Sequence, residues 1–142
     1  MPNRNVQIRP GTVADLAAVA AVQDASPQSA HWRVSDYFSH DFLVARVGNL
    51  TAGYLVYRTV APGEREILDL AVSPDFRRRG IGRALLGAAI AGFQGLIFLE
   101  VRESNPVARA FYKSLNFQEV MRRERYYRDP AEAAIVMKFH SC

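Results

Sequence analysis

The sequence has little that could build a covalent or metal-based framework. Its 142 residues include one cysteine, Cys142, so no disulfide scaffold can form and a reducing compartment fits. A single terminal thiol is also a poor candidate nucleophile, because nothing fixes its position. The three histidines (His31, His40 and His140) lack the spacing of metal ligands, so we expect no metal cofactor.

Long hydrophobic runs are absent as well. No stretch approaches the length that spans a bilayer, and the opening MPNRNVQIRP lacks the apolar core of a signal peptide. We therefore expect a cytoplasmic protein with no membrane partner. No internal repeat, linker or low-complexity segment interrupts the chain, which predicts one globular domain over residues 1–142.

Lysine is scarce, and the positive charge is carried by arginine. Of the 18 basic residues only Lys113 and Lys138 are lysines, and the formal net charge is +4. Arginine suits bidentate contacts with phosphate and carboxylate groups. The excess favours anionic partners, such as the phosphates of a coenzyme or an RNA-rich assembly, although solvated surface charge explains it equally. No nucleic-acid-binding motif accompanies it.

Hydrophobic periodicity and turn residues divide the chain into alternating strands and helices. The expected strands are residues 6–9, 42–47, 50–59, 66–72, 96–101, 117–127 and 135–140. The expected helices are residues 13–25, 27–39, 81–93 and 106–115. This order predicts an α/β fold with a mixed, largely antiparallel sheet of about seven strands and about four helices.

The segment LDLAVSPDFRRRGIGRALL, residues 68–86, combines a buried strand, three arginines and a glycine-rich helix start. Pro74 ends the strand, and the helix begins at Gly80-Ile81-Gly82, with Ile81, Leu85, Ala88 and Gly92 expected on one apolar face. Glycines leave the first backbone N–H groups of that helix uncovered, at the positive end of its dipole. Such a site binds an anion, and a pyrophosphate fits best.

Three interpretations compete for this segment. A solvated basic turn before a helix is the simplest. A dinucleotide-binding loop requires a turn directly after the strand and a third small residue, but seven residues intervene and position 85 is leucine; a triphosphate loop lacks its Gly-Lys-Ser/Thr. The third interpretation is a coenzyme A loop, because Arg77-x-x-Gly80-x-Gly82 after an apolar strand resembles the signature of the GNAT N-acetyltransferase superfamily.

Glu100 stands in LIFLEVR, an otherwise apolar strand, and shares a face with Leu96 and Phe98. A carboxylate there needs a partner or access to water. It is either a strand-end glutamate paired with Arg102 or another arginine, or a general base in a cleft of the sheet.

Asn105 and Tyr112 lie seven residues apart, which is two turns along one helix face. Asn105 suits the N-cap of a helix whose first residue is Pro106, and Asn116 takes the place of a glycine after the last turn. Tyr112 is either a core residue or a donor of a proton to a departing sulfur.

The segments LDLAVSPDFRRRGIGRALL, LEVRESNPVARAFYKSLNF, RYYRDP and AIVMKF closely resemble the RimI group of GNAT enzymes, which acetylate the N-terminal amine of a small-subunit ribosomal protein. The resemblance spans about residues 42–139 and implies the GNAT fold with acetyl-CoA as co-substrate. It implies that Glu100 is the base and Tyr112 the acid, with Tyr126 and Tyr127 near the acceptor. The coenzyme-binding residues that it implies are Leu70, Ala71, Val72, Arg77, Arg78, Arg79, Gly80, Ile81, Gly82, Arg83 and Asn105.

The chain departs from this group near the acceptor. Arg128 follows Tyr127 where the group often has proline, and Glu132-Ala133-Ala134 holds one acid where the group often has two. Away from the acceptor, the helix after Gly82 is short, with Gly92-Phe93-Gln94-Gly95 where the group usually has a longer charged segment. We expect acetyl transfer to a primary amine, preferentially a protein N-terminal α-amine. The alternatives are a small-molecule amine as acceptor and a non-catalytic acyl-CoA-binding module.

Overall fold

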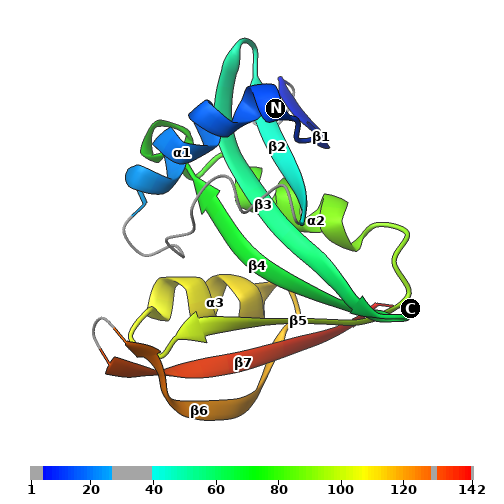
Figure 1. Ribbon diagram of the computed structural model, residues 1–142, viewed down its shortest axis with the longest axis vertical. Coiled ribbons are helices and arrows are strands. Elements are labelled where there is room, and N and C mark those ends of the chain that lie inside the picture. The colour runs from blue at the N-terminus through cyan, green and yellow to red at the C-terminus, as the bar shows by residue number, and fades with distance from the viewer. Residues whose placement is uncertain (1–4, 27–39, 129–130, 142) are drawn as a thin grey trace. The chain divides into compact units, whose positions relative to one another are not determined.

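The computed structural model describes residues 5–26, 40–128 and 131–141. The chain divides into two compact units: unit 1 holds residues 1–58 and 68–92, and unit 2 holds residues 59–67 and 93–142. The strands are hydrogen-bonded in the order β1-β2-β3-β4-β5-β7-β6 (Figure 1). A single domain over residues 1–142 stays a prediction.

Unit 1 carries the first helices and strands, close to where the sequence predicts them. They are β1 (Val6–Pro10), a 3-10 turn (Val13–Asp15), α1 (Leu16–Asp24), β2 (Asp41–Val47) and α2 (Ile81–Ile90), with most of β3 (Leu50–Ala61) and the end of β4 (Glu64–Val72). Strands β1, β2 and β3 pair antiparallel. The expected helix over residues 27–39 lies outside the described residues.

The two helices of unit 1 cover opposite faces of its strands. Val19 and Val22 of α1 pack against Tyr54 and Val56 of β3. A Cβ added at the neighbouring Gly53 would contact the side chain of Leu85 in α2 at 3.3 Å. Because side chains alternate along a strand, β3 presents Tyr54 to α1 and Gly53 to α2.

The predicted buried face of α2 is partly wrong. Ile81 and Leu85 are buried as expected, but Ala88 is exposed, and Leu86 and Ala89 are buried instead. The helix ends at Ile90, so Gly92, at φ +74°, lies beyond it. Positions 88 and 89 are both alanine, and hydrophobicity alone could not tell which of them meets the sheet.

Unit 2 consists of a helix beside three long strands. They are β5 (Gly95–Arg102), α3 (Pro106–Ser114), β6 (Gln118–Arg128) and β7 (Ala131–Ser141). β5 pairs with β4 in parallel and with β7 antiparallel, and β7 pairs antiparallel with β6. The seven-stranded, largely antiparallel sheet is thus confirmed, and β7 begins four residues before the expected position 135.

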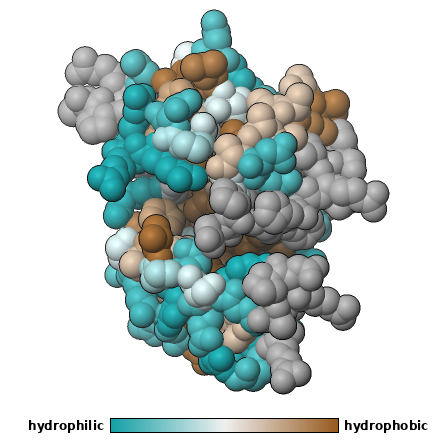
Figure 2. Space-filling model, turned by 90° about the vertical axis from the view of Figure 1, so that its left-hand side faces the viewer, coloured by the Kyte–Doolittle hydropathy of each residue, from teal (hydrophilic) through white to brown (hydrophobic). Residues whose placement is uncertain are grey.

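Exposed large hydrophobic residues are distributed over several elements. They are Val13, Leu50, Val60, Val107, Val120 and Met121. On the face in Figure 2, hydrophilic and hydrophobic residues are interspersed among those coloured. Among the described residues, no helix is both long and apolar enough to cross a membrane.

An ion pair between half-buried Arg9 and buried Asp15 fixes the chain between β1 and α1. Both oxygens of Asp15 accept from the Arg9 guanidinium at 2.9 Å, and one of them also accepts the Thr12 backbone N–H at 2.7 Å. These hydrogen bonds, chiefly those from Arg9, lower the pKa of Asp15 to about 2. Thr12 is thus the N-cap of the 3-10 turn, and Asp15 organises the start of α1.

Asp15→Asn should lower the free energy of unfolding by about 2 kcal/mol at pH 7, because the pKa of Asp15 lies below its unfolded value. That stabilisation is complete above about pH 5 and is lost as the pH falls towards 2. Urea unfolding at pH 7, 4 and 3 should show the gap between wild type and variant narrowing. Asp24→Asn, exposed on the same helix, serves as control; an equal effect there would contradict the assignment.

Candidate active site

The segment after β4 is held by backbone hydrogen bonds before it reaches the arginines. Ser73 donates its N–H to Ala52 at 2.7 Å, and Phe76 donates to Ser73 at 2.9 Å. Residues Pro74–Phe76 form a short 3-10 turn. The arginines and the start of α2 therefore follow a fixed strand end.

Two left-handed residues shape the loop before α2. Arg78 has φ +64° and Gly80 has φ +75°, and Gly80 is the N-cap of α2. The Ala84 N–H donates to the Gly80 carbonyl at 2.9 Å, so the N–H groups of Ile81, Gly82 and Arg83 have no intrahelical partner. A left-handed residue followed by helical ones directs successive N–H groups to one side, which suits an anion.

The arginines of this loop are exposed. Arg77 donates from Nε to the Val72 carbonyl at 3.3 Å, and the Arg79 guanidinium lies 5.2 Å from the centroid of the Phe76 ring. Within the described part of the chain, Arg77, Arg78, Arg79 and Arg83 form no ion pair. Four cationic groups thus stand beside the N–H groups without a carboxylate to neutralise them.

The strand end that the sequence assigns to pantetheine lies beyond the ladder between β4 and β5. That ladder runs from the pair Glu64–Leu96 to the pair Ile67–Leu99. Leu70 and Val72 are half-buried, and Ala71 is 6% exposed. The backbone groups of these three residues are therefore not used in this ladder.

Unit 2 places its candidate residues on two different faces of its strands. Phe117, which follows α3, stacks on Phe139 at 5.3 Å, and Phe139 pairs with Ile97 across the ladder between β7 and β5. Helix α3 therefore covers the face of β5 that carries Ile97, Leu99 and Val101. Glu100 points to the opposite face, as the alternation of strand residues requires.

Only one of the two carboxylate oxygens of Glu100 has a hydrogen-bond partner among the described residues. Its side chain is 13% exposed, and Oε1 accepts a hydrogen bond from Arg123 Nη1 at 2.7 Å. The other oxygen, Oε2, is buried and has no hydrogen-bond partner among the described residues. Arg102, the partner considered from the sequence, pairs instead with Glu132 at 3.2 Å. The glutamate is thus paired with another arginine and keeps one oxygen available.

Tyr112 is 7% exposed on the α3 face. Its ring meets Phe111 and Phe117 edge to face, with centroid distances of 5.1 and 5.6 Å. Glu100 and Tyr112 therefore lie on opposite faces of the same strands.

Asn105 is confirmed as the N-cap of α3. Its Oδ1 accepts the Ala108 N–H at 3.1 Å, and Pro106 occupies the first helical position. Asn116 is left-handed at φ +73°, as expected. The cap already uses the Asn105 side chain, and its contact with a coenzyme stays a prediction.

Only the backbone of the expected acceptor tyrosines is described. Tyr126 and Tyr127 lie in β6, and Tyr127 pairs with Glu132 of β7 after a register shift. Glu132 accepts the Ser104 N–H at 2.6 Å in addition to its bond from Arg102, and these contacts lower its pKa. The single acid expected near the acceptor is therefore already neutralised by an arginine.

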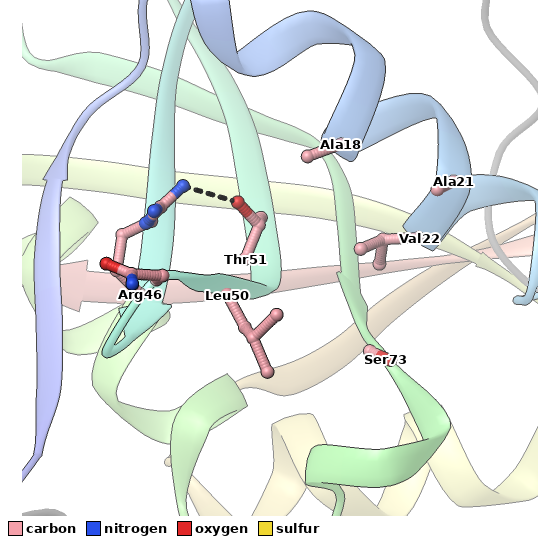
Figure 3. Close-up of a pocket in the computed structure, with 8 residues that line it drawn as sticks. Ala18, Ala21, Val22, Arg46, Leu50, Thr51 and Ser73 are labelled. Atoms are coloured by element: carbon pink, nitrogen blue, oxygen red, sulfur yellow. Dashed lines mark hydrogen bonds between the residues drawn. The ribbon is translucent and has the colours of Figure 1, made fainter.

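A surface cavity of about 320 Å³ in unit 1 was not expected from the sequence (Figure 3). Its lining comes from α1, the hairpin of β2 and β3, and the residue after β4: Ala18, Ala21, Val22, Arg46, Asn49, Leu50, Thr51 and Ser73. Arg46 Nη1 donates to Thr51 Oγ1 at 3.0 Å. None of the predicted site residues lines it. In the described residues, no group of three or more potential metal ligands is present.

Comparison with known proteins identifies a family. The model of the Acetyltransferase (GNAT) family matches residues 13–117. The chain is 37% identical over 101 residues to N-alpha-acetyltransferase RimI of Mycobacterium tuberculosis, a match that covers 68% of this chain. The first curated relatives are matched over only 26% to 64% of their own length.

Solved structures match over nearly the whole chain. Ard1 from Thermoplasma volcanium aligns with a TM-score of 0.88 and 26% identity, covering 97% of this chain and 99% of that one. The ribosomal-protein-S18-alanine N-acetyltransferase from Escherichia coli aligns with a TM-score of 0.79 and 29% identity, covering 96% and 94%.

The anion site at the start of α2 can be tested with two glycines of one helix. Gly82→Asp would place a negative charge among the free N–H groups, so acetyl-CoA affinity measured by calorimetry should fall at least about tenfold. Gly87→Asp is the control, because Gly87 is exposed in α2 with nothing within 4 Å of an added Cβ. Unchanged affinity in a folded Gly82→Asp protein, or an equal loss in both variants, would contradict the site.

Proposed function

This chain belongs to the GNAT acetyltransferase family, and we propose that it transfers the acetyl group of acetyl-CoA to the α-amine of a protein N-terminus. The observation that carries the proposal is the loop before α2, where N–H groups without an intrahelical partner follow left-handed Gly80 among exposed arginines. The relative from Mycobacterium tuberculosis, named an N-alpha-acetyltransferase, supports the same reaction.

The coenzyme contacts in this proposal follow the loop and the strand end of unit 1. The N–H groups of Ile81, Gly82 and Arg83, after Gly80, would hold the pyrophosphate, with Arg77, Arg78 and Arg79 beside them. Backbone groups of Leu70, Ala71 and Val72 would pair with pantetheine. Asn105 would add a further contact while it caps α3.

The reaction proceeds by direct attack. The acceptor amine passes its proton towards Glu100 while its nitrogen forms a bond to the thioester carbon. The oxyanion of the tetrahedral intermediate is stabilised by a backbone N–H near Val72. When the carbon–sulfur bond breaks, the Tyr112 hydroxyl donates a proton to the leaving thiolate. Proton removal and proton donation are thus assigned to different faces.

The acceptor is proposed to be an α-amine because of its acidity. An α-ammonium group has a pKa of about 7.7 to 8.0, against about 10.4 for lysine. Near pH 7.5, a lysine therefore needs roughly 3 kcal/mol more to lose its proton, which one carboxylate supplies poorly. The Escherichia coli relative is named for the alanine of ribosomal protein S18, so an alanine-starting ribosomal protein in the cytoplasm is our first candidate.

The acceptor class can be tested with a pair of peptides. We expect an alanine-starting peptide to be acetylated at its α-amine, and the same peptide with a blocked N-terminus and one lysine to react less than about one hundredth as fast. Mass spectrometry locates the acetyl group. Preferred transfer to lysine or to a small amine would contradict the acceptor. Acetyl-CoA binding without turnover on any amine would indicate a non-catalytic binding module.

Tyr112→Phe keeps the ring between Phe111 and Phe117 and removes only the hydroxyl. Turnover should fall on the order of 100-fold, with acetyl-CoA affinity and melting temperature nearly unchanged. The assay is thiol release from acetyl-CoA with the alanine-starting peptide. Normal turnover combined with a lower melting temperature would instead assign Tyr112 to the core.

A further inference from the structure

The ion pair between Glu100 and Arg123 joins two strands that are not neighbours in the sheet. The two residues come from β5 and β6, with β7 between them. In register, Glu100 pairs with Val136, and Arg123 pairs with Ala134. Arg123 therefore crosses β7 on the Glu100 face to reach Oε1 at 2.7 Å.

Ala134 makes this crossing possible. It is fully buried, and its side chain is a single methyl group, so it leaves room above β7 for a guanidinium. Ala134 also pairs with Arg102 on its other side. Arg102 is held by Glu132 and Arg123 by Glu100, so these two arginines pair with different carboxylates.

The two oxygens of Glu100 have different surroundings. Oε1 receives the charge-assisted hydrogen bond from Arg123, whereas Oε2 is buried and has no partner among the described residues. A buried oxygen without a hydrogen bond is costly, and a catalytic role is one of the reasons for which native proteins keep such an atom. An N–H donor from a substrate would satisfy Oε2.

We infer that Arg123 is a positioning residue for the acceptor amine: it holds the Glu100 carboxylate so that Oε2 receives the amine N–H. The inference rests on the proposed acetyl transfer and adds a residue to it. The ion pair thus fixes where the amine nitrogen lies when it passes its proton towards Glu100.

The neighbouring arginine provides a matched control. Arg122 lies on the other face, where its Nε donates to Glu103 Oε2 at 2.6 Å. Both arginines lie in β6, both side chains are 45% exposed, and both pair with a glutamate. Arg122 also pairs with Glu124, and neither of its glutamates is a proposed site residue, so Arg122→Gln should leave acetyl transfer unchanged.

A double-mutant cycle tests the inference. It compares wild type, Glu100→Gln, Arg123→Gln and the double variant, with Arg123→Lys and Arg122→Gln beside them. The rate of thiol release from acetyl-CoA is measured at increasing concentrations of the amine that the wild type acetylates fastest. We expect kcat/KM to fall about 100-fold for Glu100→Gln and about tenfold for Arg123→Gln. The double variant should be no slower than Glu100→Gln alone, because Arg123 acts only through Glu100.

Arg123→Lys, which keeps the charge, should recover most of the loss, and acetyl-CoA affinity should stay at the wild-type value throughout. Losses that multiply in the double variant would overturn the inference, and so would an Arg122→Gln defect equal to that of Arg123→Gln. If Arg123→Gln fails to fold, Arg123→Lys is used in its place. Full activity of Arg123→Lys then supports the inference only if that activity is lost when Glu100→Gln is added. If the wild type acetylates no amine, both the proposed acetyl transfer and the role of Arg123 are overturned. If the wild type is active but the losses of Glu100→Gln and Arg123→Gln multiply in the double variant, only the role of Arg123 is overturned.

Discussion

The alternation of side chains along β5 and β7 is the constraint on which the candidate site depends. One face of these strands is closed by α3 and its aromatic residues, among them Tyr112 and Phe117. The other face carries Glu100, Arg102 and the arginine that crosses from β6. A shift of register by one residue would exchange these sets, so the buried aromatic cluster on one face also holds the charged groups on the other.

In unit 1 the same dependence of chemistry on backbone conformation is seen in the loop before α2. Left-handed Arg78 and Gly80 turn the chain so that helical N–H groups lie free beside exposed arginines. The strand before the loop is tied to β3 through Ser73, so the loop starts from a fixed point. Binding a phosphate there requires little further ordering of the backbone.

Much of this could be predicted from the sequence. The strands and three helices follow from hydrophobic periodicity and from Gly, Pro and Asn at their ends, and Asn105 and Asn116 have the capping roles expected of them. The prediction of the buried face of α2 was partly wrong, because Ala88 and Ala89 are equally hydrophobic and the sequence does not show which of them is buried. The cavity beside Arg46 left no signal, since its lining comes from residues far apart in the chain.

The sequence by itself determined the family, the order of strands and helices, and the residue types that the chemistry needs. A motif of arginines and glycines after an apolar strand is local, so it can be read without the fold. The partner of Glu100 is not local: Arg102 is two residues away, whereas Arg123 is brought to it across β7. Only the tertiary structure decides which arginine meets which carboxylate, because strand register sets the distance between charges that the sequence merely supplies.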